Sequence, residues 1–293
     1  MAENELKRYL KYLGVLLIVL GALFAVKAAT APREPSFSWK PVSMDGHRSG
    51  ALCVTQENVD YALGTFRDDE YEAPSGRVYA LDTPIAKAAA TLMEVQPGMA
   101  YLKEVIGHSA RMMDNTRNIP DIPLGNLVAD ALREQASIYY QVPVDFAICN
   151  YGGIRVPMPE GAVTLDDISS MFPFKNYMCL AQVKGENLTR LLEQLAGTDA
   201  FQPISGATVK VKAHQLQEAL VGGEPIDPRK VYRVATIDFL LDGGDQIRIG
   251  ALAQDVKLSR VLLQDVMLNY IRGCEAQGKV IDSQADGRVV MED

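Results

Sequence analysis

The stretch LGNLVADALREQASIYYQVPVDFAICNYGGIR, residues 124–155, changes its hydrophobic period half-way, and this change indicates the fold class. Apolar residues recur at helical spacing over Leu124–Ile138, which predicts an amphipathic helix. Further on, Val144, Phe146 and Ile148 alternate with their neighbours, as in a strand, and the strand ends before two glycines that make a turn. A helix, a strand and a glycine turn in succession predict a domain built from layers of helices and sheets.

The flanking sequence continues this mixture of helices and strands. We predict a short strand within residues 75–82, a helix over 84–95 capped by Thr83, a strand over Met178–Val183, a helix over 187–197, a strand over 231–241 and a last helix over 259–274. Because some strands are linked as hairpins, the pattern favours an α+β or mixed α/β domain over a strict parallel βαβ repeat.

The first 31 residues differ in kind from the rest of the chain. Three basic residues precede an uninterrupted apolar run, Leu13–Val26, which predicts an export signal or an N-terminal membrane anchor. Ala29-Thr30-Ala31 has the form that a signal peptidase cleaves, but Pro32 follows it directly, so both readings stay open. The charge pattern places the body of the protein outside the cytoplasm, in the periplasm, either membrane-anchored or exported. We expect a spacer and lead-in over residues 32–97 and the main domain over 98–293.

Overall charge and cysteine content narrow the functional classes. A net charge of −8 offers no basic surface for a phosphate backbone, which argues against a nucleic acid polymer as partner. A mononucleotide needs only local positive charge and is not excluded.

Four widely spaced cysteines form no pair or cluster of the kind that binds zinc, so we expect buried thiols.

Five short stretches occur in a fixed order: LGNLVADALR (124–133), NYGGIR (150–155), FPFKN (172–176), KGENLTRLLE (184–193) and YRVATIDFLLDGGD (232–245). Together they resemble the C-terminal domain of the 5'-nucleotidase family, over roughly Tyr101 to the end of the chain. The resemblance implies a four-layer α/β/β/α domain that holds the substrate. In the family, a separate N-terminal metallophosphoesterase domain carries two metal ions and the attacking water.

The resemblance also implies which residues would hold the base of a nucleotide. Two aromatic rings sandwich the base in this family, and Phe174 and Phe239 stand at the corresponding positions. Asn176 stands where the family has an asparagine that contacts the base. Stacking on aromatic rings contributes roughly 1–3 kcal/mol per base and tolerates different bases, so we expect broad specificity.

The phosphate would be held near the first glycine turn. Arg155 closes this turn, where Asn150, Gly152 and Gly153 let the backbone approach a ligand and a guanidinium can grip phosphate oxygens. An ion pair of Arg155 with Glu160 or Asp121 on the surface is the alternative. Arg117 stands near the position of a second phosphate arginine of the family.

Several positions depart from the family pattern or match it weakly. Gln246 and Ile247 follow Asp245 where the family often has glycine and an aromatic residue, and Asp245 itself is expected to fix the turn. Tyr151 replaces a common glycine, so its ring would either narrow the approach to the phosphate or point to solvent. Phe201 is a weaker candidate for the base pocket.

The histidines are too few and too scattered for a catalytic metal centre. The three in this chain, His47, His108 and His214, cannot supply the ligands of a two-metal site. We therefore expect no cofactor here and divalent metals in a partner chain. The sequence predicts the substrate-binding half of a split 5'-nucleotidase, holding nucleoside monophosphates or nucleosides for a separate metallophosphoesterase and inactive alone. The alternatives are a non-catalytic membrane-tethered nucleotide-binding module and a domain whose pocket has decayed.

Overall fold

The computed structural model describes residues 64–116, 119–198 and 201–292. The predicted leader, residues 1–31, and the spacer that follows it lie outside these ranges. By its contacts the chain divides into two units, Met1–Val42 and Ser43–Asp293, and every described element belongs to the second. No helix in the described ranges has the length and apolarity needed to cross a bilayer.

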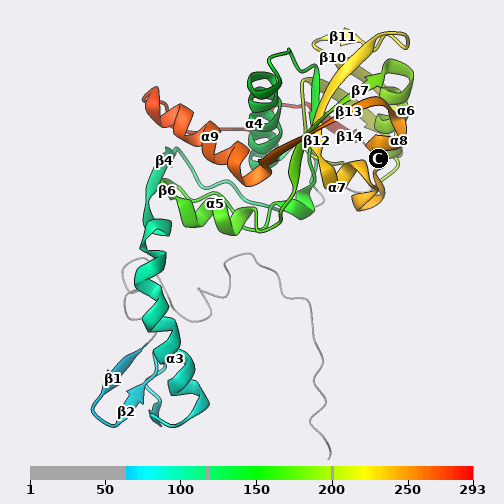
Figure 1. The fold of residues 1–293 in the computed structure, drawn as a ribbon. Helices are drawn as coiled ribbons and strands as arrows, with labels where there is room; N and C mark the ends of the chain where they lie inside the picture. The colour runs from blue at the N-terminus through cyan, green and yellow to red at the C-terminus, as the bar shows by residue number, and fades with distance from the viewer. Residues whose placement is uncertain (1–63, 117–118, 199–200, 293) are drawn as a thin grey trace, which may run out of the picture. The chain divides into compact units, whose positions relative to one another are not determined.

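The central sheet has five strands in the order β13 (Ala253–Leu262), β7 (Tyr177–Lys184), β12 (Val231–Ile237), β5 (Phe146–Ile148) and β8 (Ile204–Ser205). The first three of these strands are labelled in Figure 1. β12 runs antiparallel to β7 and parallel to β5, so the sheet is mixed. Helix α4 (Pro123–Tyr140) packs on β5, β8 and β12 and against helix α9 (Leu263–Ala276). All three residues of β5 are buried, as expected for a strand covered on both faces.

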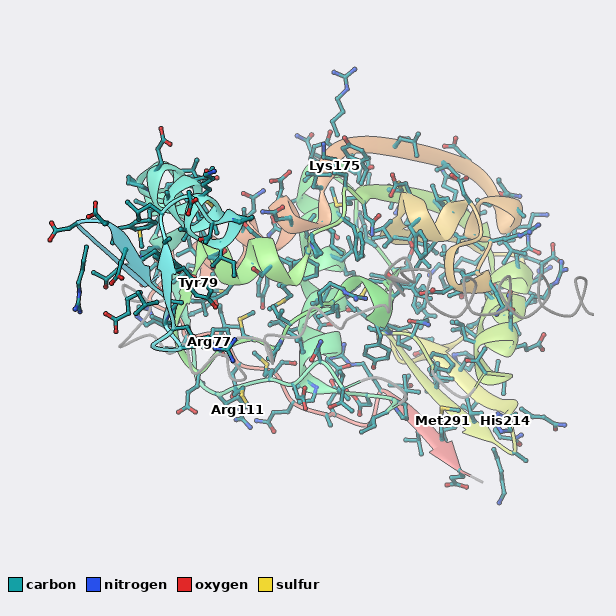
Figure 2. The ribbon with its side chains drawn as sticks, turned by 90° about the horizontal axis from the view of Figure 1, so that it is seen from below. Arg77, Tyr79, Arg111, Lys175, His214 and Met291 are labelled. Atoms are coloured by element: carbon teal, nitrogen blue, oxygen red, sulfur yellow. The ribbon has the colours of Figure 1, made fainter. Side chains whose placement is uncertain are left out.

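A second sheet has four strands in the order β11 (Glu224–Pro225), β10 (Gln215–Val221), β9 (Ala207–Lys212) and β14 (Val289–Glu292). β9 and β10 form an antiparallel hairpin, and β14 pairs with β9 in parallel. His214, in the hairpin turn, and Met291, on β14, therefore lie at the same end of this sheet (Figure 2). Helix α6 (Gly185–Ala196) contacts β7 and β12 of the central sheet and also β10.

The mixed α/β class predicted from the sequence is confirmed. The apolar side chains that define the predicted helical faces of α4 and α6 are buried in one continuous core, with the exception of the exposed Ile138. Cys149 and Cys179 lie in this core as free thiols, and Cys274 is half-buried. Burial raises the pKa of the Cys149 and Cys179 thiols to about 12.

A two-stranded sheet and several short helices complete the domain. The sheet consists of β4 (Val105–Ser109) and β6 (Gly161–Thr164), and α5 (Leu165–Met171) follows β6 directly. Thr164 caps α5 by accepting a hydrogen bond from the Asp167 N–H, and the Asp167 carboxylate accepts one in return from the Thr164 N–H. The short helices are η3 (Tyr151–Gly153), α7 (Asp238–Leu241), η4 (Gly244–Gln246) and α8 (Ile249–Leu252).

The described part of the lead-in folds as a small unit with its own core. Strands β1 (Thr65–Arg67), β2 (Glu70–Glu72) and β3 (Val78–Ala80) form an antiparallel sheet, and helix α3 (Pro84–Val95) and the 3-10 helix η2 (Gln96–Lys103) follow. Tyr71, Ala86 and Ala89 are buried together there. Thr83 Oγ1 accepts a hydrogen bond from the Ala86 N–H, as the predicted helix cap requires.

Two of the predicted boundaries are wrong. The strand predicted over residues 231–241 ends at Ile237, because the Asp238 carboxylate accepts a hydrogen bond from the Phe239 N–H and helix α7 begins there. The last helix begins at Leu263 rather than at residue 259. The Asp265 carboxylate accepts a hydrogen bond from the Leu262 N–H at that point, while the residues before it pair with β7 as part of β13.

Candidate functional site

A cavity of about 320 Å³ lies where three distant parts of the chain meet. It is lined by Asn150, Gly152, Gly153, Arg155, Phe174, Asn176, Phe239 and Asp245. Seven of these are residues that the sequence analysis singled out; the eighth, Asp245, was expected only to fix a turn. Arg117, the other arginine proposed for the phosphate, lies outside the described residues.

The two candidate aromatic rings line this cavity and remain accessible. Phe174 is 46% exposed and Phe239 is 42% exposed, whereas Phe172, two residues before Phe174, is 2% exposed. Within the described ranges neither candidate ring stacks on another aromatic ring. Large apolar rings are normally buried, so two accessible ones in one cavity provide surface for a flat ligand.

The glycine turn after α7 makes room for the ring of Phe239. A Cβ atom added to Gly244 would overlap this ring, so only glycine fits there without moving it. Gly243 has a φ of 109°, a conformation that glycine adopts without strain. The turn at residues 243–245 thus also forms part of the cavity wall, through Asp245.

The side chain of Asn150, which directly precedes the first glycine turn, lines the cavity. Asn150 Nδ2 donates a hydrogen bond of 2.7 Å to Asp245 Oδ2, which joins the two turns. A Cβ atom on Gly153 would come within 2.9 Å of Asn150 Oδ1, so the glycine leaves space for this amide. Asn150 is buried, and its Oδ1 has no hydrogen-bond partner among the described residues. An acceptor of this kind is available to a ligand donor.

Arg155 brings an unpaired positive charge to the same cavity. Its Nη1 donates to the Gly152 carbonyl at 3.1 Å, and its buried Nε has no partner among the described residues. The guanidinium carbon lies 5.8 Å from the centre of the Phe174 ring, within the range of a cation–π contact. No carboxylate of the described residues pairs with it; Asp121, an alternative partner, accepts hydrogen bonds from Asn126 and Gly287 instead. A half-buried guanidinium without a counter-ion favours an anionic ligand.

The cavity lies in a region of the chain that matches a known protein family. The model of the family described as "5'-nucleotidase, C-terminal domain" matches residues 105–252, about half of the chain. The chain belongs to the 5'-nucleotidase family. All of the lining residues of the cavity fall inside the matched region of this 5'-nucleotidase domain.

The relatives of this 5'-nucleotidase domain are longer proteins. The chain is similar to protein UshA of Escherichia coli, with 26% identity over 155 residues, which are 50% of this chain and 27% of that protein. It is also similar to a 5'-nucleotidase of Vibrio cholerae, with 25% identity over 209 residues, covering 68% of this chain and 36% of the relative. The chain therefore spans only about a quarter to a third of these curated relatives.

Solved structures show the same fold. A 5'-nucleotidase precursor from Thermus thermophilus matches with a TM-score of 0.62 at 23% identity, covering 71% of this chain and 43% of that one. An NAD nucleotidase from Haemophilus influenzae matches with a TM-score of 0.55 at 18% identity, covering 76% of this chain and 48% of that one. The fold predicted from the family resemblance agrees with both.

Two aromatic residues of the 5'-nucleotidase domain lie elsewhere than the sequence suggested. Tyr151 is 4% exposed and packs against Gly125, where a Cβ atom would come within 2.8 Å of the ring. It neither narrows the cavity nor points to solvent, and burial raises the pKa of its hydroxyl. Phe201 is fully buried and does not line the cavity, so its proposed place in the base pocket is wrong. Gln246 and Ile247, the two departures after the glycine turn, do not line it either.

The described part of the 5'-nucleotidase domain does not fit a catalytic metal centre. No group of three or more His, Cys, Asp or Glu side chains in residues 64–116, 119–198 and 201–292 could hold a metal ion. His108 Nδ1 lies 3.3 Å from Glu275 Oε2 on an exposed surface, and His47 lies outside the described residues. We derive no metal-dependent step from these side chains.

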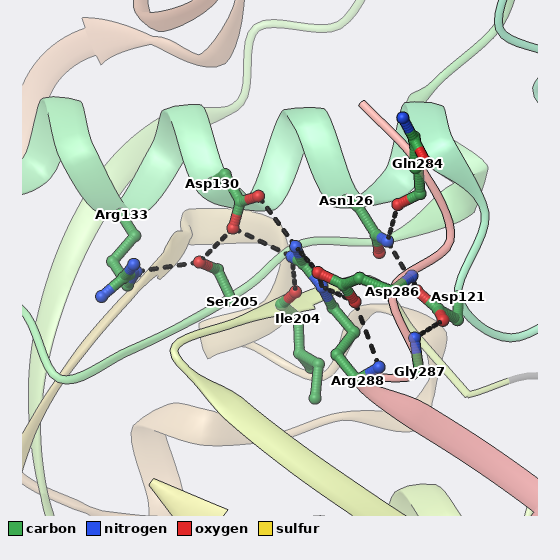
Figure 3. Close-up of polar contacts among 10 residues, drawn as sticks. All are labelled: Asp121, Asn126, Asp130, Arg133, Ile204, Ser205, Gln284, Asp286, Gly287 and Arg288. Carbon is green, nitrogen blue, oxygen red and sulfur yellow. Dashed lines mark hydrogen bonds and ion pairs between the residues drawn. The ribbon is translucent and has the colours of Figure 1, made fainter. Parts of the chain in front are cut away.

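A larger cavity, of about 500 Å³, is lined by Arg288 together with residues of α4, the start of β9 and the turn after β10. Arg288 donates to both Asp130 of α4 and Asp286, at 2.9 and 2.7 Å, and Asp130 also accepts from Ser205 (Figure 3). Arg133 Nε donates to the same serine. The charged groups of this network bond to one another and attach β14 to α4. We therefore assign a structural role to this cavity, although it is larger than the cavity lined by Phe174 and Phe239.

Proposed function

We propose that this chain binds nucleoside 5'-monophosphates in the cavity between Phe174 and Phe239, as the substrate-binding part of a split 5'-nucleotidase. The single observation that carries the proposal is that two half-exposed rings and the guanidinium of Arg155, which pairs with no carboxylate of the described residues, line one cavity. A nucleoside monophosphate has the matching parts, a flat base and an anionic phosphate. Membership of the 5'-nucleotidase family supports the same class of ligand.

Each part of the ligand has a candidate partner. The base would stack on Phe174 and Phe239, with Asn176 at the rim to hydrogen-bond it. Arg155 would hold the phosphate through donors that no carboxylate of the described residues occupies. Asn150 Oδ1 would accept a hydrogen bond from the ligand. The cavity of about 320 Å³ is at the lower end of the range for small-molecule sites, roughly 300–1,000 Å³.

The hydrolytic centre would come from a separate metallophosphoesterase chain that holds divalent metals. The chain has only three histidines, and its described residues offer no set of metal ligands. The two relatives that it matches extend well beyond the part that is similar to this chain. This chain would then position the substrate, which is the contribution of proximity and orientation to the reaction.

Export to the periplasm agrees with the proposal of separate substrate-binding and hydrolytic chains. The leader, residues 1–31, has the charge and apolar pattern of a signal or anchor. One relative, 28% identical over 206 residues, is described as a cell wall protein of Listeria monocytogenes. We propose that the domain works outside the cytoplasm and is attached to the membrane or exported through this leader.

Phosphate release tests the split-enzyme proposal. We expect the pure full-length chain to release no phosphate from AMP in the presence of divalent metals. A metallophosphoesterase recovered by pull-down from native membranes should release phosphate, and faster once this chain is added. Metal-dependent release by this chain alone would contradict the proposal.

A second candidate is a non-catalytic, membrane-tethered module that captures nucleotides or nucleosides. It is favoured by the fact that both rings, Asn150 and Arg155 already line one cavity within this chain. The pull-down separates the two functions. Recovery of a metallophosphoesterase supports the split enzyme, and recovery of this chain without one, together with AMP binding, supports the module.

A further inference from the structure

We infer that Asp238 is a positioning residue, which holds the two aromatic walls of the cavity at a fixed separation; this inference rests on the proposed function. Asp238 is the first residue of α7 and is half-buried. Its Oδ1 accepts two hydrogen bonds, from the Tyr177 N–H at 3.0 Å and from the Phe239 N–H at 2.9 Å. It does not line the cavity itself.

The hydrogen bond from the Tyr177 N–H joins the segments that carry the two rings, whereas the one from the Phe239 N–H lies within α7. Tyr177 directly follows Asn176 and lies three residues after Phe174, while Phe239 is on α7. The ladder between β7 and β12 ends at the pair Met178–Ile237, immediately before this point. Beyond that pair the ladder does not continue, and the Asp238 carboxylate links the two segments by accepting from the Tyr177 N–H.

The rest of the fold does not depend on this contact. The Asn176 carbonyl accepts a hydrogen bond of 2.9 Å from the Leu263 N–H, which attaches the Phe174 segment to α9. Leu240 and Leu241 of α7 are buried in the main core. Loss of the Asp238 carboxylate would therefore leave both segments attached to the domain, but no longer to each other through this oxygen.

Stacking is sensitive to the separation that this carboxylate controls. A gap widened by about 0.5–1 Å already loses a quarter to a half of the dispersion attraction between two surfaces. Arg155 is held by its own hydrogen bonds, from its Nη1 to the Gly152 carbonyl and from its backbone N–H to the Met171 carbonyl. Neither bond involves Asp238, so we expect the grip on phosphate to be unchanged. Loss of Asp238 should thus weaken the binding of the nucleoside and leave the binding of phosphate intact, which general destabilisation would not do.

Three variants of the full-length chain test the inference. Asp238→Ala removes the acceptor, whereas Asp238→Asn keeps an Oδ1 that can accept the same two hydrogen bonds. Asp242→Ala is the matched control, because it removes a nearby carboxylate that does not line the cavity. Adenosine and inorganic phosphate are measured as competitors of AMP by calorimetry, and amide hydrogen exchange is followed at Tyr177 and Phe239 without ligand.

We expect Asp238→Ala to bind adenosine about tenfold more weakly, the equivalent of one lost hydrogen bond, with unchanged phosphate affinity and faster exchange at both amides. Asp238→Asn and Asp242→Ala should match the wild type. If Asp238→Ala binds adenosine with wild-type affinity, or loses equal affinity for adenosine and phosphate, the inference about Asp238 is overturned. The proposed function would not be affected by either result. Failure of the wild-type chain to bind AMP would instead contradict the proposed function, and the ligand-positioning role of Asp238 with it.

Discussion

The cavity between Phe174 and Phe239 and the larger cavity around Arg288 use their polar groups in opposite ways. In the first, the Arg155 guanidinium and Asn150 Oδ1 keep bonding capacity that the described residues do not fill, and two rings remain half-exposed. In the second, the arginine is saturated by two carboxylates. Unfilled bonding capacity costs stability unless a ligand uses it, so the smaller cavity is the better candidate for function.

The comparison predicts that the Arg288 network contributes to stability and not to binding. Arg288→Met should lower the free energy of unfolding by roughly 2–4 kcal/mol, because the largely buried Arg288 side chain loses its hydrogen bonds to Asp130, Asp286 and the Ile204 carbonyl. Urea denaturation measures the change. AMP affinity of the folded variant should equal that of the wild type.

Arg272 provides a matched control for this variant. Its pair with Glu104 lies on the surface, where ion pairs contribute about 0–1 kcal/mol. Arg272→Met should therefore change stability little. A loss of AMP affinity in Arg288→Met without a loss of stability would mean that we have assigned the two cavities the wrong way round.

The smaller cavity is predicted to be sensitive to one added methyl group. Gly244→Ala places a Cβ atom where the Phe239 ring lies, so the ring must move and nucleoside binding should weaken by roughly 1–3 kcal/mol, the value of one stacked base. Gly244 does not have a positive φ, so the backbone itself accepts alanine. Calorimetric titration with adenosine measures the effect.

Gly273→Ala is the control, because nothing lies within 4 Å of an added Cβ atom there. It should bind adenosine as the wild type does. Unchanged adenosine affinity in Gly244→Ala would show that the position of the Phe239 ring is not important for binding.

The smallest predicted effect concerns the pH dependence of the Arg288 network. Hydrogen bonds from Arg288 hold the pKa of Asp286 below its ordinary value. Because the folded-state pKa is depressed, the stabilisation is present above the unfolded-state value, about 3.9, and is lost as the pH falls through the folded-state value. The Asp286 side chain is 51% exposed, so solvent screening keeps the contribution small.

Thermal unfolding across the acid range tests this sign. The wild type should be slightly more stable than Asp286→Asn above about pH 4 and should lose that advantage below it. High salt should reduce the difference at every pH. An advantage that grows on acidification would have the wrong sign for an ionised Asp286 paired with Arg288.

The sequence predicted those parts of the fold that depend on local pattern. The apolar faces of α4 and α6 and the Thr83 cap follow from spacing within one segment, and the structure contains them as predicted. The candidate site residues came from motifs, since nothing in the local sequence distinguishes Phe174 from a core phenylalanine.

The parts that failed depend on contacts between distant segments. The run VATIDFLL is apolar enough to be one strand, but the strand ends at Ile237, where the Asp238 carboxylate accepts hydrogen bonds from the N–H groups of Tyr177 and Phe239. Tyr151 turns into the core because Gly125, on α4, leaves space for its ring. β14 pairs with β9 from nearly eighty residues away, and no local pattern indicates that pairing.

One titration series tests the central claim most directly: AMP, adenosine and inorganic phosphate against the wild type, Phe239→Ala and Arg155→Ala. We expect the wild type to bind AMP. Phe239→Ala should lose roughly 1–3 kcal/mol of adenosine binding with little change for phosphate, and Arg155→Ala should do the reverse. No AMP binding by the wild type, or equal losses for adenosine and phosphate in either variant, would contradict the account.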